Sequence, residues 1–220
     1  MIKAVTIHLP DERRLNWDFD FSLQGTMRMG NLFLQAIPPW IRLEYCQCPA
    51  CTLDPKVNPT CPVAEVLYGH ARDLANRKSF ERVNVDIYEE TGQTLSLENV
   101  PLQTVVSELV RLAVFQYECP IGRIVKPAMA QLPPFPTNEE ILYAFARAFA
   151  TDAEGPSGQL STDQKAFLEC LHDLFGNLSV RLERVGEGDA HLNGIVILHS
   201  LAVLFTLSAP ELISALAPRS

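Results

Sequence analysis

Four of the six cysteines in this 220-residue chain lie within sixteen residues, from Cys46 to Cys61. Cys48 and Cys51 are separated by two residues, and a turn of this length lets both thiolates bind one tetrahedral metal ion. Cys61 follows after nine further residues and can supply a third thiolate. The spacing therefore predicts a metal-binding site in this segment.

The fourth metal ligand has two candidates, Cys46 and the distant Cys119. Only one residue separates Cys46 from Cys48, so an extended chain would point their side chains in opposite directions. Cys119 is followed by proline, as Cys48 and Cys61 are, and it comes at the end of a predicted helix. We therefore favour a site made of Cys48, Cys51, Cys61 and Cys119, with Cys46 as the alternative fourth ligand.

The identity of the metal is less constrained than the site. Four cysteine thiolates are typical of structural zinc, which is our first expectation. Four thiolates also hold iron–sulfur clusters, but the regular Cys-x2-Cys-x2-Cys spacing of bacterial ferredoxins is absent from this sequence. A third interpretation needs no metal. Cys61 precedes a predicted helix, whose N-terminus favours a thiolate, and Cys46 or Cys51 would resolve an oxidised Cys61.

Charge, composition and missing motifs exclude several classes of protein. The net charge is −8 and the eighteen basic residues are scattered, which argues against a nucleic-acid partner. The N-terminal residues contain no apolar run typical of a signal peptide, so we expect a cytoplasmic protein with reduced cysteines. The sequence contains no nucleophile elbow, P-loop or dinucleotide fingerprint. It leaves enzyme activity open but favours a protein without it.

The N-terminal part of the chain is predicted to contain two hairpins. Alternating apolar residues place one hairpin at residues 5–21 and the other at residues 83–97. Between them, Pro62 suits the first turn of a helix that we expect to run to about Asn76. Another helix is predicted from Pro101 to about Tyr117, and the proline-rich segment at residues 131–136 is predicted to lack regular structure.

The C-terminal half is predicted to be helical. Three capping-box patterns mark the expected helix starts: Thr137 with Glu140, Ser161 with Gln164, and Ser208 with Glu211. The apolar stretch at residues 194–207 is shorter than the roughly 18 residues that a membrane span needs. We therefore expect a core helix without a membrane span, whose outer side binds a protein partner or a second copy of the chain.

These elements predict an α+β fold. We expect a small antiparallel sheet of two hairpins with a cysteine-rich metal knuckle, followed by a helical C-terminal half. Residues 1–125 would form the α+β part with the knuckle, and residues 126–220 the helical part, packed together as one globular unit.

Several segments resemble an uncharacterised bacterial family of unknown function. The resemblance covers residues 43–150 and rests on Cys-Pro-Ala-Cys at 48–51, Cys-Pro-Val-Ala at 61–64, Glu-Cys-Pro at 118–120 and a Pro-Phe stretch ending at Phe135. Glu118 stands where the family pattern has glycine. The resemblance implies Cys48, Cys51, Cys61 and Cys119 as the shared cysteines, leaves Cys46 as an additional one, and supplies no known activity.

Three functions are compatible with the sequence. The first is a non-enzymatic cytoplasmic protein with structural zinc, acting as an interaction or adaptor module. The second is a thiol-redox or iron–sulfur protein that uses the Cys46–Cys61 cluster. The third is a small-molecule binding or sensor protein with a cleft between sheet and helices around Trp17, Trp40 and the loop at residues 133–136.

Overall fold

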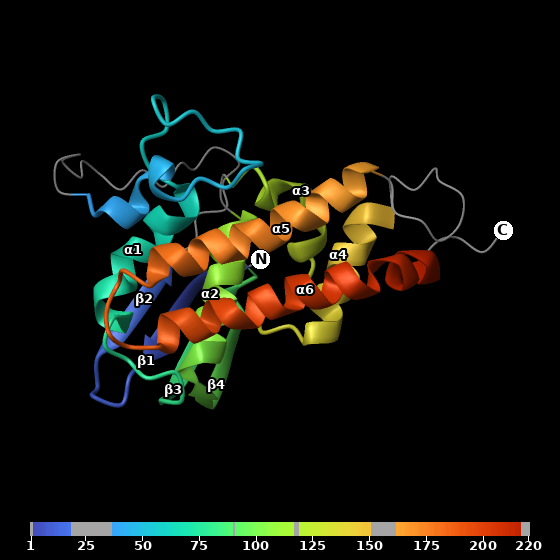
Figure 1. Ribbon diagram of the computed structural model, residues 1–220. Coiled ribbons are helices and arrows are strands. Elements are labelled where there is room, and N and C mark those ends of the chain that lie inside the picture. Colours follow the sequence, from blue (N-terminus) through green and yellow to red (C-terminus); the bar gives the residue numbers. More distant parts are fainter. Residues whose placement is uncertain (1, 19–36, 90, 117–118, 151–161, 217–220) are drawn as a thin grey trace.

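The computed structural model describes residues 2–18, 37–89, 91–116, 119–150 and 162–216 and has an α+β fold. A four-stranded antiparallel sheet lies at one end of the molecule, and the helices cover one of its faces (Figure 1). The second half of the chain is mostly helical. The predicted fold class is thereby confirmed.

The sheet consists of the two predicted hairpins. β1 (Ile2–His8) pairs with β2 (Arg14–Asp18), and β3 (Arg82–Glu89) pairs with β4 (Thr94–Pro101). The hairpins join through β1 and β3, which gives the strand order β2-β1-β3-β4. Because side chains alternate between the two faces of a strand, the apolar residues of the pattern in β1, β2 and β3 are buried on one face, whereas Leu95 in the edge strand β4 is 39% exposed. The predicted strand residues Phe19 and Phe21 lie outside the described residues.

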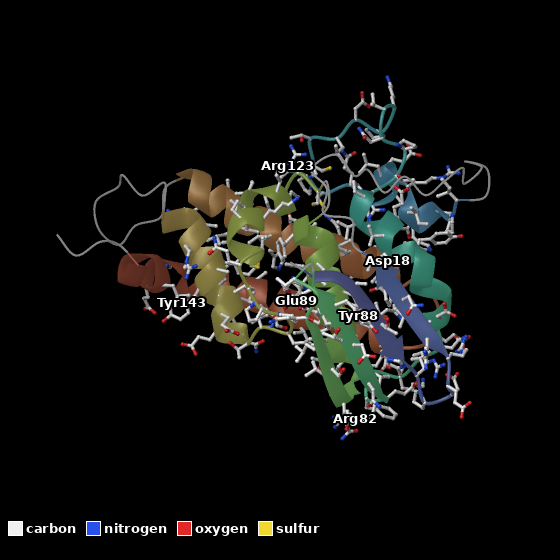
Figure 2. All side chains as sticks on the ribbon, turned by 180° about the vertical axis from the view of Figure 1, so that it is seen from behind. Asp18, Arg82, Tyr88, Glu89, Arg123 and Tyr143 are labelled. Carbon is white, nitrogen blue, oxygen red and sulfur yellow. The ribbon has the colours of Figure 1, made fainter. Side chains whose placement is uncertain are left out.

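The two faces of the sheet differ sharply in character. Val5, Ile7 and Val85 are at most 1% exposed on the inner face. The outer face carries polar side chains, and Asp18, Arg82 and Tyr88 project from the uncovered side of the sheet in Figure 2. There, Asp86 accepts a hydrogen bond of 2.6 Å from Ser96 and lies 2.7 Å from the His8 ring, which lowers the pKa of Asp86.

The helices of the described residues form a layered bundle. The elements are α1 (Pro62–Leu74), α2 (Leu102–Gln116), α3 (Gly122–Met129), α4 (Asn138–Ala150), α5 (Thr162–Leu182) and α6 (Ala190–Leu216). α2 packs on the sheet and on α6, and α5 and α6 lie side by side along the molecule (Figure 1). Apolar side chains from the strands and from these helices join in one core.

Capping patterns predicted one described helix start correctly. Thr137 and Glu140 form the expected capping box, in which the Glu140 N–H bonds the Thr137 hydroxyl at 3.2 Å and the Thr137 N–H bonds the Glu140 carboxylate at 2.7 Å. Ser161 lies outside the described residues. The helix start predicted at Ser208 was wrong, because α6 continues through Pro210 and the Ser208 hydroxyl bonds the Leu204 carbonyl at 2.8 Å instead.

The proline-rich segment at residues 131–136 has no helix or strand, as predicted, but the residues before it form a short helix, α3, with Pro127 inside it. Four of its residues are buried, including Val125 and Met129, so packing against α2 and α4 outweighs the cost of proline. The helix also crosses the proposed boundary between residues 125 and 126. The division of the chain into two parts stays a prediction.

By length and composition, α6 is the one helix of the described residues that could cross a membrane. Such a helix is weak evidence for a span, because the core helix of a soluble protein passes the same test. One side of α6 is buried against α2, α4 and α5, with Ile195, Leu198 and Phe205 at most 2% exposed. The opposite side exposes Val196 and Leu207.

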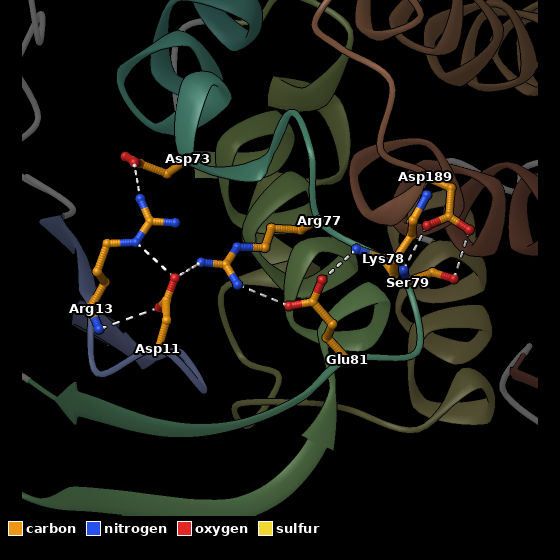
Figure 3. Close-up of polar contacts among 8 residues, drawn as sticks. All are labelled: Asp11, Arg13, Asp73, Arg77, Lys78, Ser79, Glu81 and Asp189. Atoms are coloured by element: carbon orange, nitrogen blue, oxygen red, sulfur yellow. Dashed lines mark hydrogen bonds and ion pairs between the residues drawn. The ribbon is translucent and has the colours of Figure 1, made fainter.

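A polar network fixes the loops at the sheet end of the bundle (Figure 3). Arg77, just after α1, bonds Asp11 in the β1–β2 turn and Glu81 before β3. Asp189, just before α6, accepts hydrogen bonds from the Ser79 N–H at 2.7 Å and from its hydroxyl at 3.0 Å. These contacts join three connections that lie far apart in the sequence.

Candidate metal centre

The two ends of the cysteine-rich loop, residues 42–61, lie side by side at the surface of the core. A short 3-10 turn (Pro39–Ile41) precedes the loop, and α1 follows it. The Cys61 N–H donates to the Ile41 carbonyl at 2.8 Å, and the Leu43 N–H donates to the Pro59 carbonyl at 3.0 Å. These two backbone hydrogen bonds close the base of the loop, so its cysteines are held near the N-terminus of α1.

Within the loop, Cys48 and Cys51 lie in a tight turn. The Cys51 N–H donates to the Cys48 carbonyl at 2.9 Å. The side-chain amide of Gln47 spans the turn, donating to the Leu53 carbonyl at 2.8 Å and to the Cys51 carbonyl at 3.3 Å. This is the turn that the two-residue spacing predicted. No pattern in the sequence indicated that Gln47 would hydrogen-bond across it.

Cys61 and Cys119 both lie where a helix begins. Cys61 is the residue before α1, and its sulfur is close enough to the Val63 and Ala64 N–H groups for them to favour a thiolate, although neither makes a full capping hydrogen bond. Cys119 precedes α3, and the Gly122 N–H donates to its sulfur at 3.5 Å. Helix N-termini carry partial positive charge, so both positions stabilise negative charge on sulfur.

Gly122 also sets how closely α3 approaches α2. A Cβ atom at this position would lie 2.0 Å from the Val114 carbonyl oxygen. Only glycine permits this approach. The close contact therefore holds the Cys119 segment against the core.

The four favoured cysteines influence one another electrostatically. Burial, followed by the neighbouring Cys61, raises the pKa of Cys48 to about 12, and Cys119 and Cys51 add to the shift. Burial raises the pKa of Cys119 to about 11, with smaller contributions from Cys61 and Cys51. Burial also raises the pKa of Cys61, and Cys51 adds to that shift. The fold thus brings together thiols from the loop, from the start of α1 and from the start of α3.

The two remaining cysteines are placed differently. Cys46 is half-buried at the end of a 3-10 turn (Leu43–Tyr45) and is not among the largest influences on the pKa of the other loop cysteines. Cys170 lies on α5, where burial and the nearby Asp173 and Glu169 raise its pKa. Of the two candidates for a fourth ligand, Cys119 is therefore the one that lies in the electrostatic environment of Cys48.

The sulfur atoms of the four favoured cysteines do not surround a common centre in this structure. In the described part of the chain, no three side chains of cysteine, histidine, aspartate or glutamate are placed to hold a metal ion as they stand. Ligand sulfurs lie about 2.3 Å from a bound zinc ion. The thiols are thus within range for charge interaction, and binding one ion requires their side chains to turn toward a common centre.

Two residues of α5 interact with the cysteines, and the sequence analysis did not identify either of them as part of the site. Asn177 hydrogen-bonds Cys48, which favours the thiolate, and the positive charge of Arg181 favours the thiolate of Cys61. A signal was available, because Arg181 continues the buried stripe of Leu174 and Leu178 at helical spacing. A charged residue in such a stripe indicates a buried partner.

Comparison with known proteins gives a family without a function. One family model, a domain of unknown function called DUF6901, matches residues 8–218. The chain belongs to this family. No curated protein and no solved structure matches it. The expectation of an uncharacterised family is confirmed, and the family adds no ligand, partner or activity to the geometry.

Among the described residues, Asp189, His191 and His199 do not form a group that could hold a metal ion. Asp189 instead binds Ser79, and His191 is 2% exposed in the core. The His199 ring lies 4.6 Å from that of His172, measured between ring centres. Trp17 and Trp40, which were expected to line a ligand cleft, are likewise buried in the core.

Proposed function

We propose that this chain is a non-enzymatic cytoplasmic protein in which Cys48, Cys51, Cys61 and Cys119 bind one structural zinc ion, and that it acts as an interaction or adaptor module. The supporting observation is that Cys48 is electrostatically coupled to the other three thiols. A site with four thiolates has no open coordination position, which is typical of structural zinc and leaves no place for a substrate on the metal.

The redox alternative requires a reactive thiolate at Cys61. Reactivity rises when the pKa of a thiol falls, whereas burial raises the pKa of Cys61. The shift has the opposite sign to the one that a redox nucleophile needs. An iron–sulfur cluster would use the same four residues and differs from zinc by its visible absorption.

The exposed side of α6 is the surface that we assign to a partner. Val196, Val203, Leu204 and Leu207 are each between 39% and 76% exposed and recur at helical spacing. The helix carries no charged residue from Ala190 to Pro210. A second copy of this chain can therefore cover the stripe without like-charge repulsion, and a symmetric dimer is the common form of such pairing.

Cobalt and zinc titrations of cysteine variants test the zinc site. We expect Cys48→Ser to abolish tight metal binding and to lower the free energy of unfolding by more than about 4 kcal/mol, because structural zinc contributes directly to folding. Cys170→Ser, on α5, is the matched control and should bind normally. Cobalt absorption and urea unfolding report the two quantities.

The same set separates the two candidates for the fourth ligand. Cys119→Ser should behave like Cys48→Ser, and Cys46→Ser should behave like the wild-type protein. A Cys48→Ser variant that remains fully stable and binds zinc as tightly as the wild type would refute the proposed function.

A further inference from the structure

The side chain of Arg181 on α5 is almost completely buried, with 2% exposure, beside the cysteine loop. Its Nη1 donates to the Trp40 and Arg42 carbonyls at 2.6 and 2.7 Å, and its Nη2 donates to the Leu43 carbonyl at 3.0 Å. These carbonyls belong to the chain segment that forms the base of the loop. Arg181 therefore fastens the loop to α5.

The hydrogen bonds satisfy the donors of Arg181 but not its charge. Among the residues that the structure describes, no carboxylate forms an ion pair with Arg181. Arg111, which is also fully buried, shows the usual arrangement, with Glu108 bonded to it at 2.6 and 2.7 Å. Burying a cation without an anion costs desolvation free energy. A negative charge close to Arg181 would therefore stabilise the folded protein.

The cysteine cluster is the place where such charge would arise. Four thiolates around a divalent ion leave two negative charges in excess. The charge of Arg181 already acts on Cys61, and Asn177, one helical turn earlier on α5, hydrogen-bonds Cys48. One face of α5 thus approaches two of the four proposed ligands.

We propose that Arg181 is a positioning residue that supplies the counter-charge for a divalent cation held by the four thiolates of Cys48, Cys51, Cys61 and Cys119. This inference rests on the proposed function and deepens it, because it specifies the charge of the bound complex. It also couples metal binding to the docking of α5, since the same guanidinium holds the base of the loop.

Zinc affinity of three arginine variants tests the proposal. Partners outside the ligand shell typically change metal affinity by about 10–100-fold, and we expect a loss in that range for Arg181→Met. Arg181→Lys keeps the charge with fewer hydrogen bonds and should recover most of the affinity. The control is Arg184→Met, because Arg184 is exposed and its side chain donates to the Tyr45 hydroxyl of the same segment, at 3.2 Å. A competing chromophoric chelator gives each affinity.

A purely structural role for Arg181 predicts a different pattern. Arg181→Met would then lower the stability of the zinc-loaded and chelator-treated proteins equally, whereas our proposal expects the larger loss in the zinc-loaded protein. Wild-type affinity in Arg181→Met, or equal losses of stability in both forms, would overturn the proposal. If the wild-type protein itself binds no zinc, the proposed function fails first, and the wild-type titration alone shows it.

Discussion

Three thiols of the candidate site, those of Cys48, Cys61 and Cys119, are held in their protonated form when no metal is bound. The pKa values of about 12 for Cys48 and about 11 for Cys119 lie far above neutral pH, and the pKa of Cys61 is also raised. A metal ligand, however, must be a thiolate. Zinc therefore has to displace a proton from each sulfur that it binds.

This requirement predicts proton release on zinc binding. Near pH 7 we expect at least three protons, those of Cys48, Cys61 and Cys119, to leave per zinc bound, and the affinity to fall as the pH falls. Calorimetric titration in two buffers of different ionisation enthalpy measures the number of protons. Release of fewer than about two protons per zinc would contradict a site of four thiols.

The stability of the metal-free protein depends on pH in the opposite direction: zinc affinity falls as the pH falls, whereas this stability falls as the pH rises. The folded pKa of Cys48 lies above the ordinary value of 9.0, so the fold favours its protonated form. Its contribution to stability is complete below about pH 9 and is lost as the pH rises toward 12. Zinc-loaded protein has no proton to lose at these sulfurs, so it should resist alkaline unfolding better than the metal-free form.

At the scale of elements, the candidate site depends on how closely α3 approaches α2. We expect Gly122→Ala to lower the free energy of unfolding by about 1–3 kcal/mol, because its methyl group would overlap the Val114 carbonyl. Zinc affinity should fall with it, since the N–H of residue 122 donates to Cys119.

Gly176→Ala is the matched control for that substitution. Gly176 lies inside α5 and has open space where a Cβ atom would be placed. Alanine should therefore stabilise the helix by about 0.5–1 kcal/mol. Urea unfolding compares the two variants, and a neutral Gly122→Ala would show that the close contact does not position Cys119.

The elements differ in how well their sequence predicted them. The four strands and α1 were predictable because apolar alternation and Pro62 are local signals. α3 was missed because its stability comes from burial of Val125 and Met129, which outweighs Pro127. The end of α6 was misjudged for the same reason, since Ala209 is fully buried beside Pro210.

The candidate site was predictable only in part. Spacing alone identified Cys48, Cys51 and Cys61, and the repeated Cys-Pro pair suggested Cys119. The contributions of Asn177 and Arg181 depend on tertiary packing of α5 against the loop. No local pattern near the cysteines contains that information.

For the whole molecule, the exposed stripe of α6 predicts self-association. Val203, Leu204 and Leu207 lie on the uncovered side of the helix. We expect a concentration-dependent dimer in sedimentation experiments and a monomer for Leu207→Glu, because a buried, unpaired carboxylate at the interface is costly. Tyr143→Glu, on the exposed side of α4, is the control and should leave the dimer intact. A wild-type protein that stays monomeric at high concentration would refute this role of the stripe.

Metal content tests the central claim most directly. It would be measured by mass spectrometry, together with an absorption spectrum, on untagged protein purified without oxygen. We predict one zinc ion per chain and a colourless solution. Protein that is folded and contains no metal would contradict the account, and iron with visible absorption would replace structural zinc by an iron–sulfur centre.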